Sequence, residues 1–346
     1  MKTRMILCAL ACIFAASTAV ADTPPTVWDR ARDPDTNGAW TAHVELHRRM
    51  KAIGDIDRGL RRDVAEAMRT DLRTRVEEAR KAHPNDVRLR FDEAAILGHI
   101  ERYAEARRAL EAVLADQPNH PMADEAYWQL AEACAHLRDH KCERRTWATV
   151  LGRHTDEVRR STPLLNAAES EMHLGNMTGS VEMYRECIRV STRTDDRRTT
   201  LLATWGLAVA FDRSGDVVAA LREATLATDL ERSNGQAQYS PLTVTFELRR
   251  KGVYFLPDHE IDWYEGLGAM ALAKKADNDL MRLAFWRRAE RSFAHYVAGA
   301  EADTSGFPTW VTIAKNRLAV STAERIKFEK RVKANPLEAP RIEETL

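Results

Sequence analysis

The sequence predicts an all-α protein, a solenoid of about five helical hairpins with capping helices at both ends. Glycine and proline are scarce, at 15 and 12 of 346 residues, and the abundant alanine, leucine, arginine and glutamate favour helix. Two Pro-Asn pairs, beginning at Pro84 and Pro118, are separated by the length of one helical hairpin. A pattern of apolar and small residues also recurs in one order along the chain, which is typical of stacked repeats.

The recurring pattern is clearest in the fourth of five copies, which begin at residues 87, 124, 161, 201 and 261. Small residues in both helices of a copy let the two helices cross closely. Gly215 can end the first helix of the fourth copy in the left-handed conformation. Pro118 stops the second helix of the first copy, because proline cannot continue the hydrogen-bond ladder. The fourth copy consists of Leu207, Ala208, Phe211, Gly215, Val217, Ala220, Ala224 and Ala227.

This pattern resembles the tetratricopeptide repeat (TPR), a helix–turn–helix unit whose usual length matches the spacing of the two Pro-Asn pairs. The resemblance covers roughly residues 87–298 and is specific in the fourth copy. It is weaker elsewhere, where Glu143 replaces a small residue and Val113 replaces alanine. It implies a right-handed solenoid whose concave groove binds a protein or an extended peptide. The alternative interpretation is a helical bundle without repeats.

The N-terminal segment 1–21 has the pattern of a secretory signal peptide. Lys2 and Arg4 form a positive region, residues 5–16 are apolar, and an Ala-Val-Ala cleavage signal precedes Asp22. The apolar stretch is too short to span a bilayer, and no later stretch is longer. We therefore expect cleavage before Asp22, a periplasmic location and no transmembrane segment after cleavage.

The chain divides into segments by composition and by fit to the repeat. The stretch 242–248 alternates apolar and polar residues, which predicts a short β-hairpin or an ordered loop. We expect a signal peptide at 1–21, a flexible segment at 22–38, capping helices at 39–86, repeats one to four at 87–232, an insertion at 233–262, a divergent fifth repeat at 263–306, and a capping helix with a tail at 307–346.

The composition and motifs favour no catalytic class. Without the signal peptide, 50 basic residues face 52 acidic ones, so no global field favours nucleic acid or an anionic membrane. The sequence contains no Gly-x-Ser-x-Gly, His-Glu-x-x-His or Cys-x-x-Cys motif and no phosphate-binding glycine loop. We expect no catalytic residue, no metal site, no cofactor and no nucleic-acid partner.

The resemblance also assigns a peptide groove, because the first helix of each unit lines the concave side of a TPR array. Four consecutive units have a large apolar residue at the fifth position, and two have glutamate at the ninth. Three histidines and an arginine stand at the thirteenth positions. The predicted groove residues are Phe91, Trp128, Leu165 and Trp205, with Glu132 and Glu169, and with His99, His136, His173 and Arg213.

Each of these groups has a functional and a structural interpretation. Aromatic anchors supply much of the binding energy of an interface, glutamates favour a basic or amide-rich segment, and histidines could make binding pH-dependent. Alternatively, the apolar residues are core packing in a register shifted by one, and the histidines only ease the helix dipole. The positions that clamp a terminal carboxylate in some TPR domains are aromatic, acidic or apolar here, so that activity is not expected.

The cysteines leave two alternatives open. Cys134 and Cys142 flank a predicted helix turn, where they form either a disulfide, which an oxidising compartment permits, or buried apolar packing. Cys187 is the third cysteine that remains after loss of the signal peptide. Cys12 follows Ala-Leu-Ala, but the apolar stretch before it is too short to favour a lipoprotein site.

These observations favour a non-enzymatic function. We expect a periplasmic scaffold or adaptor that mediates protein–protein interactions in a Gram-negative cell envelope, in association with envelope complexes. One alternative is a chaperone-like holder or assembly factor for exported proteins. Another is an accessory subunit of an envelope enzyme or motility complex.

Overall fold

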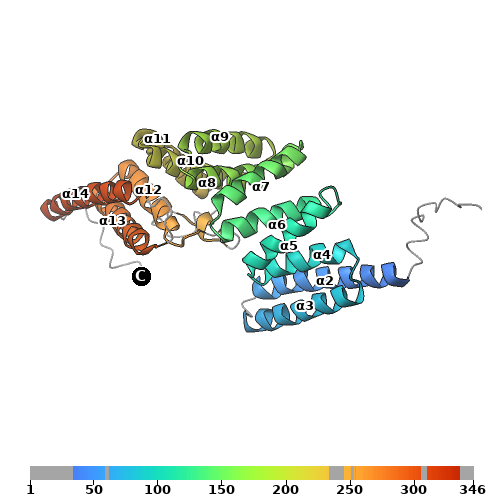
Figure 1. The fold of residues 1–346 in the computed structure, drawn as a ribbon. Coiled ribbons are helices and arrows are strands. Elements are labelled where there is room, and N and C mark those ends of the chain that lie inside the picture. The colour runs from blue at the N-terminus through green and yellow to red at the C-terminus, as the bar shows by residue number, and fades with distance from the viewer. Residues whose placement is uncertain are drawn as a thin grey trace, which may run out of the picture. The chain divides into compact units, whose positions relative to one another are not determined.

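The computed structural model describes residues 34–58, 62–233, 245–250, 253, 255–304 and 310–335. These residues are helical apart from turns and short connections (Figure 1), and none of them belongs to a strand. The predicted all-α class is confirmed. The chain forms two compact units, Met1–Ile100 and Glu101–Leu346. The signal peptide expected at 1–21 and most of the segment 22–38 lie outside the described residues.

The described residues of the first unit form three helices around a shared apolar core. Along its first helix, the buried residues Ala39, Leu46 and Ile53 recur every seven positions, as expected for one apolar face of a helix. That helix starts earlier than the predicted boundary at residue 39, and a proline at its start fits, because proline is favoured at the first helical position. The helices are α2 (Pro34–Arg58), α3 (Arg62–Ala82) and α4 (Val87–His99).

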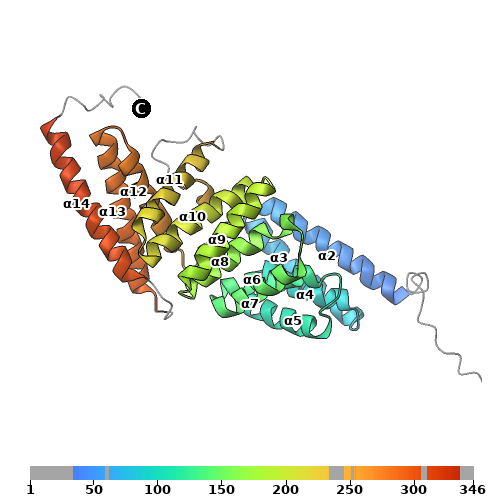
Figure 2. The ribbon, with the colours of Figure 1, turned by 90° about the horizontal axis from the view of Figure 1, so that it is seen from above.

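The second unit is a series of helices in which each packs against the next (Figure 2). The first helix of each repeat begins close to its expected position. The helices were expected to begin at 87, 124, 161, 201 and 261, and they begin at 87, 123, 161, 197 and 260. The helices of the second unit are α5 (Tyr103–Asp116), α6 (Ala123–His136), α7 (His140–Arg153), α8 (Ser161–His173), α9 (Met177–Arg193), α10 (Arg197–Ser214), α11 (Val217–Ser233), α12 (Glu260–Lys275), α13 (Asp279–Ala302) and α14 (Val311–Ala334).

The turn of the fourth repeat forms as its sequence predicts. Gly215 takes the left-handed conformation, with φ of 96°, at the end of α10. The amide of Asp216 then donates to the carbonyl of Phe211 at 2.9 Å, which satisfies a carbonyl at the helix end. Ala208 and Ala220 are fully buried where α10 packs against α11. Their small side chains allow the close crossing that defines a TPR-like hairpin.

A disulfide joins the two helices of the second repeat. The sulfurs of Cys134 on α6 and Cys142 on α7 are bonded, with their Cα atoms 5.8 Å apart. Asp139 caps α7, since its carboxylate accepts from the amide of Cys142 at 3.0 Å. Of the two interpretations, the structure therefore contains the bridge. Cys187 is a buried free thiol that donates to the carbonyl of Ser161 at 3.2 Å.

Within the second unit, contacts also reach beyond neighbouring repeats. The guanidinium of Arg138, in the turn between α6 and α7, lies 2.8 Å from the carboxylate of Asp303, which follows α13. The ring of Trp310, at the start of α14, lies 6.3 Å from that of His173 on α8. Arg317 of α14 pairs with the buried Asp212 of α10 at 2.8 Å. We call the Arg138–Asp303 pair the clasp.

The insertion between α11 and α12 folds onto the array. Its described part contains a short 3₁₀ helix, η3 (Glu247–Arg249), and no strand; residues 242–244 of the alternating stretch lie outside the described residues. The hydroxyl of Thr245 donates to Glu265 of α12 at 3.0 Å. The amide of Glu247 donates to Glu231 of α11 at 3.3 Å, and η3 packs against α10.

Glu231 should contribute a component of the protein's stability that falls as the pH rises from about 4.5 to 7. Burial raises the pKa of this carboxyl from 4.5 to about 7, and the negative charge of Glu247 adds to the effect. A carboxyl with a raised pKa holds its proton more tightly in the folded state, so ionisation within this window costs stability. Glu231→Gln should remove this component and raise the free energy of unfolding at pH 8 by on the order of 2 kcal/mol.

Denaturant unfolding at pH 5 and pH 8 measures this difference. Glu111→Gln, which replaces an exposed carboxylate on α5, is the control and should keep the pH dependence of the wild type. An unchanged pH dependence in Glu231→Gln would show that another group causes it.

None of the helices among the described residues is both long and apolar enough to cross a membrane.

Candidate functional site

A pocket of about 220 Å³ opens on the second unit, against the first helices of the second to fourth repeats. It lies beside α6, α8 and α10, and residues of α7, α9, α12 and the insertion complete its walls. The lining residues are Trp128, Glu132 and Ala135 of α6; His140 and Glu143 of α7; Thr162, Leu165, Asn166, Glu169 and His173 of α8; Tyr184 of α9; Arg198, Thr199, Leu202 and Gly206 of α10; Leu248, Val253, Phe255 and Leu256 of the insertion; and Tyr264 of α12.

Five of the ten predicted groove residues line this pocket: Trp128, Glu132, Leu165, Glu169 and His173. They come from α6 and α8, the first helices of the second and third repeats. On each of these helices, a large apolar residue stands four positions before a glutamate, and residues with this spacing lie on one helix face. The register of the repeat therefore places apolar and acidic side chains together.

Trp128 and Glu132 form one wall of the pocket. The indole nitrogen of Trp128 donates to the carboxylate of Glu132 at 2.9 Å. The ring also packs edge-on against the buried Trp147, with centroids 5.2 Å apart, which fixes its orientation. Surrounding protein raises the pKa of Glu132, although its side chain keeps contact with solvent, which limits that shift. This wall presents an anchored aromatic edge beside a carboxylate.

Two stacked histidines also line the pocket. The rings of His140 and His173 lie 4.4 Å apart and nearly parallel, with an interplanar angle of 12°. His140 Nδ1 is 3.0 Å from Glu143, and His173 Nε2 is 3.8 Å from Glu169. Each imidazole therefore has a carboxylate beside it.

A buried tyrosine forms part of the pocket lining where α9 meets α10. Tyr184 is almost fully buried, and burial raises its pKa well above 10, so its phenol is neutral at physiological pH. Its ring fits because α10 has Gly206 at the contact. A Cβ at Gly206 would come within 2.3 Å of the ring, closer than any real contact, so only glycine leaves room for this packing.

Trp205 does not line the pocket, although the register placed it there. Its side chain is fully buried, and its indole nitrogen lies 3.4 Å from the carboxylate of Glu231 on α11. The insertion explains the difference, because η3 packs against α10 and covers this part of the helix. The residue at the fifth position of the fourth repeat is therefore part of the core, as in the alternative interpretation in which the apolar residues are core packing.

Arg213 also belongs to the core and not to a groove. Its guanidinium lies 2.5 Å from the carboxylate of Glu260, and both side chains are buried. The rings of Trp263 and Trp310 lie 4.6 and 4.1 Å from it, so the cation stacks against two aromatic faces. Burial opposes both charges, yet the pair holds the pKa of Glu260 below and that of Arg213 above its ordinary value.

The remaining predicted residues are spread over both units. Phe91 is buried in the first unit, where His99 is the last residue of α4. His136 and His173 are likewise the last residues of α6 and α8, which fits the helix-dipole interpretation of all three histidines. His136 stacks on Tyr103 at 3.9 Å, and burial lowers its pKa. Of these histidines, only His173 lines the pocket.

Several lining residues were not among the predicted ones. Thr162 and Leu202 occupy the second positions of the third and fourth units, so the same register already contained a signal for them. His140 and Glu143 belong to a second helix, which the register leaves out of the groove. Phe255 comes from the insertion, and its place is set by tertiary contacts that no local pattern encodes.

Comparison with known proteins finds solved structures of similar fold but no similar sequence. No family model and no curated protein sequence matches the chain. A signal-transduction ATPase with numerous domains, which has a tetratricopeptide repeat sensor and comes from Pyrococcus horikoshii, matches at a TM-score of 0.47 with 11% identity, over 88% of this chain and 43% of that chain. The apo form of RapI matches at 0.48 with 9% identity, over 86% of this chain and 99% of that chain. The assignment of TPR-like hairpins rests on the helices of this chain itself.

Proposed function

We propose that this chain is a non-enzymatic, TPR-like binding protein that holds an extended segment of a partner protein in the pocket along α6, α8 and α10. One observation carries the proposal. The pocket lies at first-helix positions of consecutive repeats, where Trp128 and Leu165 provide apolar surface and Glu132 and Glu169 follow one turn later. An anchored aromatic residue within a concave site is the usual centre of a binding hot spot.

The lining residues favour a partner segment with a basic residue next to a large apolar one. Among the described residues that line the pocket, three provide carboxylates, Glu132, Glu143 and Glu169, and one provides a guanidinium, Arg198. Trp128 and Leu165 offer apolar contacts, and a cation can also stack on the face of an indole. A Lys or Arg of the partner would meet the carboxylates while its apolar neighbour occupies the aromatic wall.

We propose that this binding serves a scaffold or adaptor role in the periplasm of a Gram-negative cell envelope. Two features support the location. The N-terminal segment 1–21 has the signal-peptide pattern, and the Cys134–Cys142 disulfide suits an oxidising compartment. Fractionation of cells after osmotic shock tests it, and recovery of the chain with the cytoplasm would contradict it.

Site-specific photocrosslinking in cells tests the binding role. A photoreactive residue at position 162, on α8 at the pocket, should give a defined adduct whose partner segment is extended and contains a basic and a large apolar residue. The same residue at position 218, where the valine of α11 is 82% exposed outside the pocket, is the control. Equal adducts from both positions would contradict a pocket-directed partner.

The affinity of the identified segment, made as a synthetic peptide, should then depend on the aromatic wall. Trp128→Ala should weaken binding by at least about 30-fold, the effect of losing a hot-spot residue. Trp40→Ala, at an exposed tryptophan of α2, is the matched control and should bind as the wild type does. Glu169→Gln should reduce the salt dependence of association, whereas Glu182→Gln, on the exposed face of α9, should not. Unchanged affinity in Trp128→Ala would refute the proposed site.

A further inference from the structure

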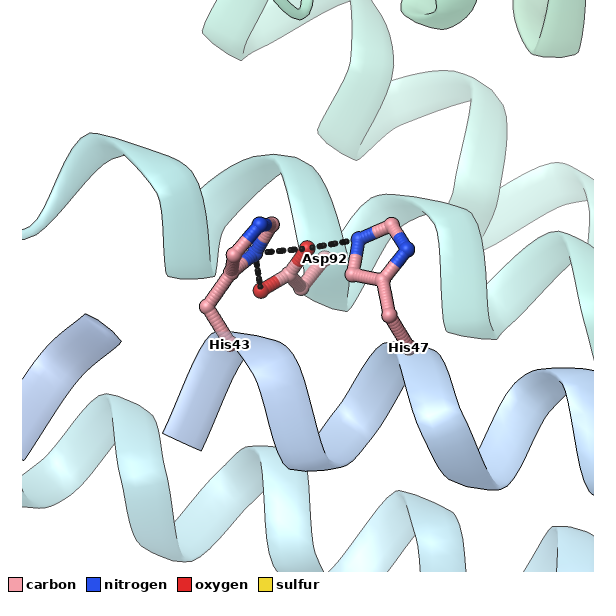
Figure 3. A group of neighbouring side chains, drawn as sticks. All are labelled: His43, His47 and Asp92. Atoms are coloured by element: carbon pink, nitrogen blue, oxygen red, sulfur yellow. Dashed lines mark hydrogen bonds and ion pairs between the residues drawn. The ribbon is translucent and has the colours of Figure 1, made fainter. Parts of the chain in front are cut away.

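Three side chains of the first unit converge on one point, far along the chain from the pocket residues. His43 and His47 project from one face of α2 toward Asp92 on α4 (Figure 3). His43 Nδ1 lies 2.8 and 3.0 Å from the two carboxylate oxygens of Asp92. His47 Nε2 lies 3.0 Å from one of them. Two imidazoles of α2 thus contact the single carboxylate of Asp92.

The three side chains differ in their exposure to solvent. Asp92 is fully buried, the side chain of His43 is 15% exposed, and that of His47 is 50% exposed. A buried carboxylate without compensation is costly, so a cation or several donors must face it. The exposed side of His47 leaves a route from solvent to the point where the three groups meet.

The charged side chains on the neighbouring elements have closer partners of their own, although Arg88 also interacts electrostatically with Asp92. Arg88, one turn before Asp92 on α4, makes its closest ion pair with Asp86 at 2.5 Å, and its guanidinium stands 5.4 Å from the ring of Trp40. On α2, Glu45 pairs with Arg48 and Arg49. The two imidazoles are therefore the nearest partners that the structure gives to the buried Asp92.

We propose that His43, His47 and Asp92 bind a divalent transition-metal ion, with Zn²⁺ as the best match. Two imidazoles and one carboxylate are typical of open zinc sites, in which water or a substrate takes the fourth position. Ions that prefer all-oxygen surroundings, such as Mg²⁺ and Ca²⁺, fit this donor set poorly. The half-exposed side of His47 provides the place for a water ligand.

The three ligand atoms already lie close enough for rotations of the side chains to bring them around one ion. The ligand atoms all lie within 4.8 Å of one another. Zinc holds such ligands at about 2.0–2.1 Å in a tetrahedron, so neighbouring ligand atoms stand about 3.3 Å apart. The imidazole-to-carboxylate separations of 2.8 to 3.0 Å are a few tenths of an ångström shorter, and the two imidazole nitrogens lie within 4.8 Å of each other. On binding, His43 would use Nδ1 and His47 Nε2, and each ring would keep its proton on the other nitrogen.

Sequence reasoning missed this site, although part of the signal was present. His43 and His47 are four positions apart, the spacing at which two side chains share one helix face. The third ligand follows His47 by 45 positions and meets the two histidines only because α4 packs against α2. The expectation of no metal site rested on local motifs, which cannot contain such a ligand.

Zinc titration of the full chain tests the proposal. The protein is purified without a histidine tag, treated with a chelator and titrated with Zn²⁺ by calorimetry, and X-ray absorption then identifies the donor atoms. We expect one Zn²⁺ per chain at micromolar or tighter affinity, with nitrogen and oxygen donors that include two imidazoles. Failure of the wild type to bind Zn²⁺ in this range would overturn the proposal.

Two variants and one control assign the site. His47→Ala, at the half-exposed ligand, and Asp92→Asn, which keeps the shape of the side chain, should each weaken Zn²⁺ binding at least about 100-fold, since loss of even an outer-shell partner costs 10–100-fold. His295→Ala, at an exposed histidine of α13, should bind as the wild type does. Circular dichroism confirms that each variant is folded. Wild-type affinity in both His47→Ala and Asp92→Asn would place the ion elsewhere and refute the assignment.

Discussion

Replacing Glu260 with alanine should lower the free energy of unfolding by about 3–5 kcal/mol. The change removes the ion-pair partner of the buried Arg213, and a buried charge that loses its partner is strongly destabilising. It also removes the acceptor of the Tyr296 hydroxyl, which donates to Glu260 at 3.2 Å. Denaturant unfolding followed by far-UV circular dichroism measures the loss.

A double replacement separates the charge effect from the loss of packing. Arg213→Met combined with Glu260→Leu removes both charges together, and an apolar replacement of a buried ion pair is often nearly neutral. The double variant should therefore lose clearly less stability than Glu260→Ala alone. Glu301→Ala breaks an exposed pair with Lys315 and should change stability by less than about 1 kcal/mol. Equal losses in the double variant and in Glu260→Ala would mean that packing dominates.

Two tryptophans at the same repeat position should respond very differently to truncation. Trp205→Ala should cost about 3–5 kcal/mol of stability, because it leaves a large cavity in the core and removes a hydrogen bond to Glu231. Trp128→Ala should cost only about 0.5–1.5 kcal/mol, chiefly from the lost edge-on contact with Trp147. Under conditions in which both variants are folded, Trp128→Ala should lose more peptide affinity than Trp205→Ala.

Thermal and denaturant unfolding of both variants, together with peptide titration, measure this contrast. Because Trp205→Ala damages the core, a loss of binding in the double variant Trp128→Ala Trp205→Ala would not identify the binding surface. The single variant Trp128→Ala is the informative one. Equal stability losses in the two single variants would contradict the different places that the structure gives to these residues.

The hairpins themselves were predictable from the sequence because local physics specifies them. Gly215 was expected to end a helix, and Ala208 and Ala220 to lie where two helices cross, so the spacing predicted the hairpins, and the resemblance to the tetratricopeptide repeat implied that they stack as a solenoid. The second and third repeats also presented Trp128, Leu165 and Glu169 at the expected positions. In these units, the side of the first helix that the repeat leaves open faces the pocket.

The rest of the site depends on contacts between segments that are distant along the chain. The burial of Trp205 depends on a distant segment, since η3 packs on α10. The alternating stretch 242–248, which overlaps η3, had predicted a short hairpin or an ordered loop. Arg213 finds Glu260 and Trp310 only after the fifth repeat and α14 have docked. Periodicity gives the register of a helix, but it does not show what covers each face.

The clasp between Arg138 and Asp303 has a mechanical consequence. An open solenoid can extend like a spring, because each repeat touches only its neighbours. In the second unit, the salt bridge links the turn after α6 to the residue after α13, 165 positions later, so elongation must first break it. The second unit should therefore resist stretching until the clasp and the other long-range contacts, Trp310 with His173 and Arg317 with Asp212, have broken. A partner that pulls on the pocket would therefore stretch the second unit very little while the clasp is intact.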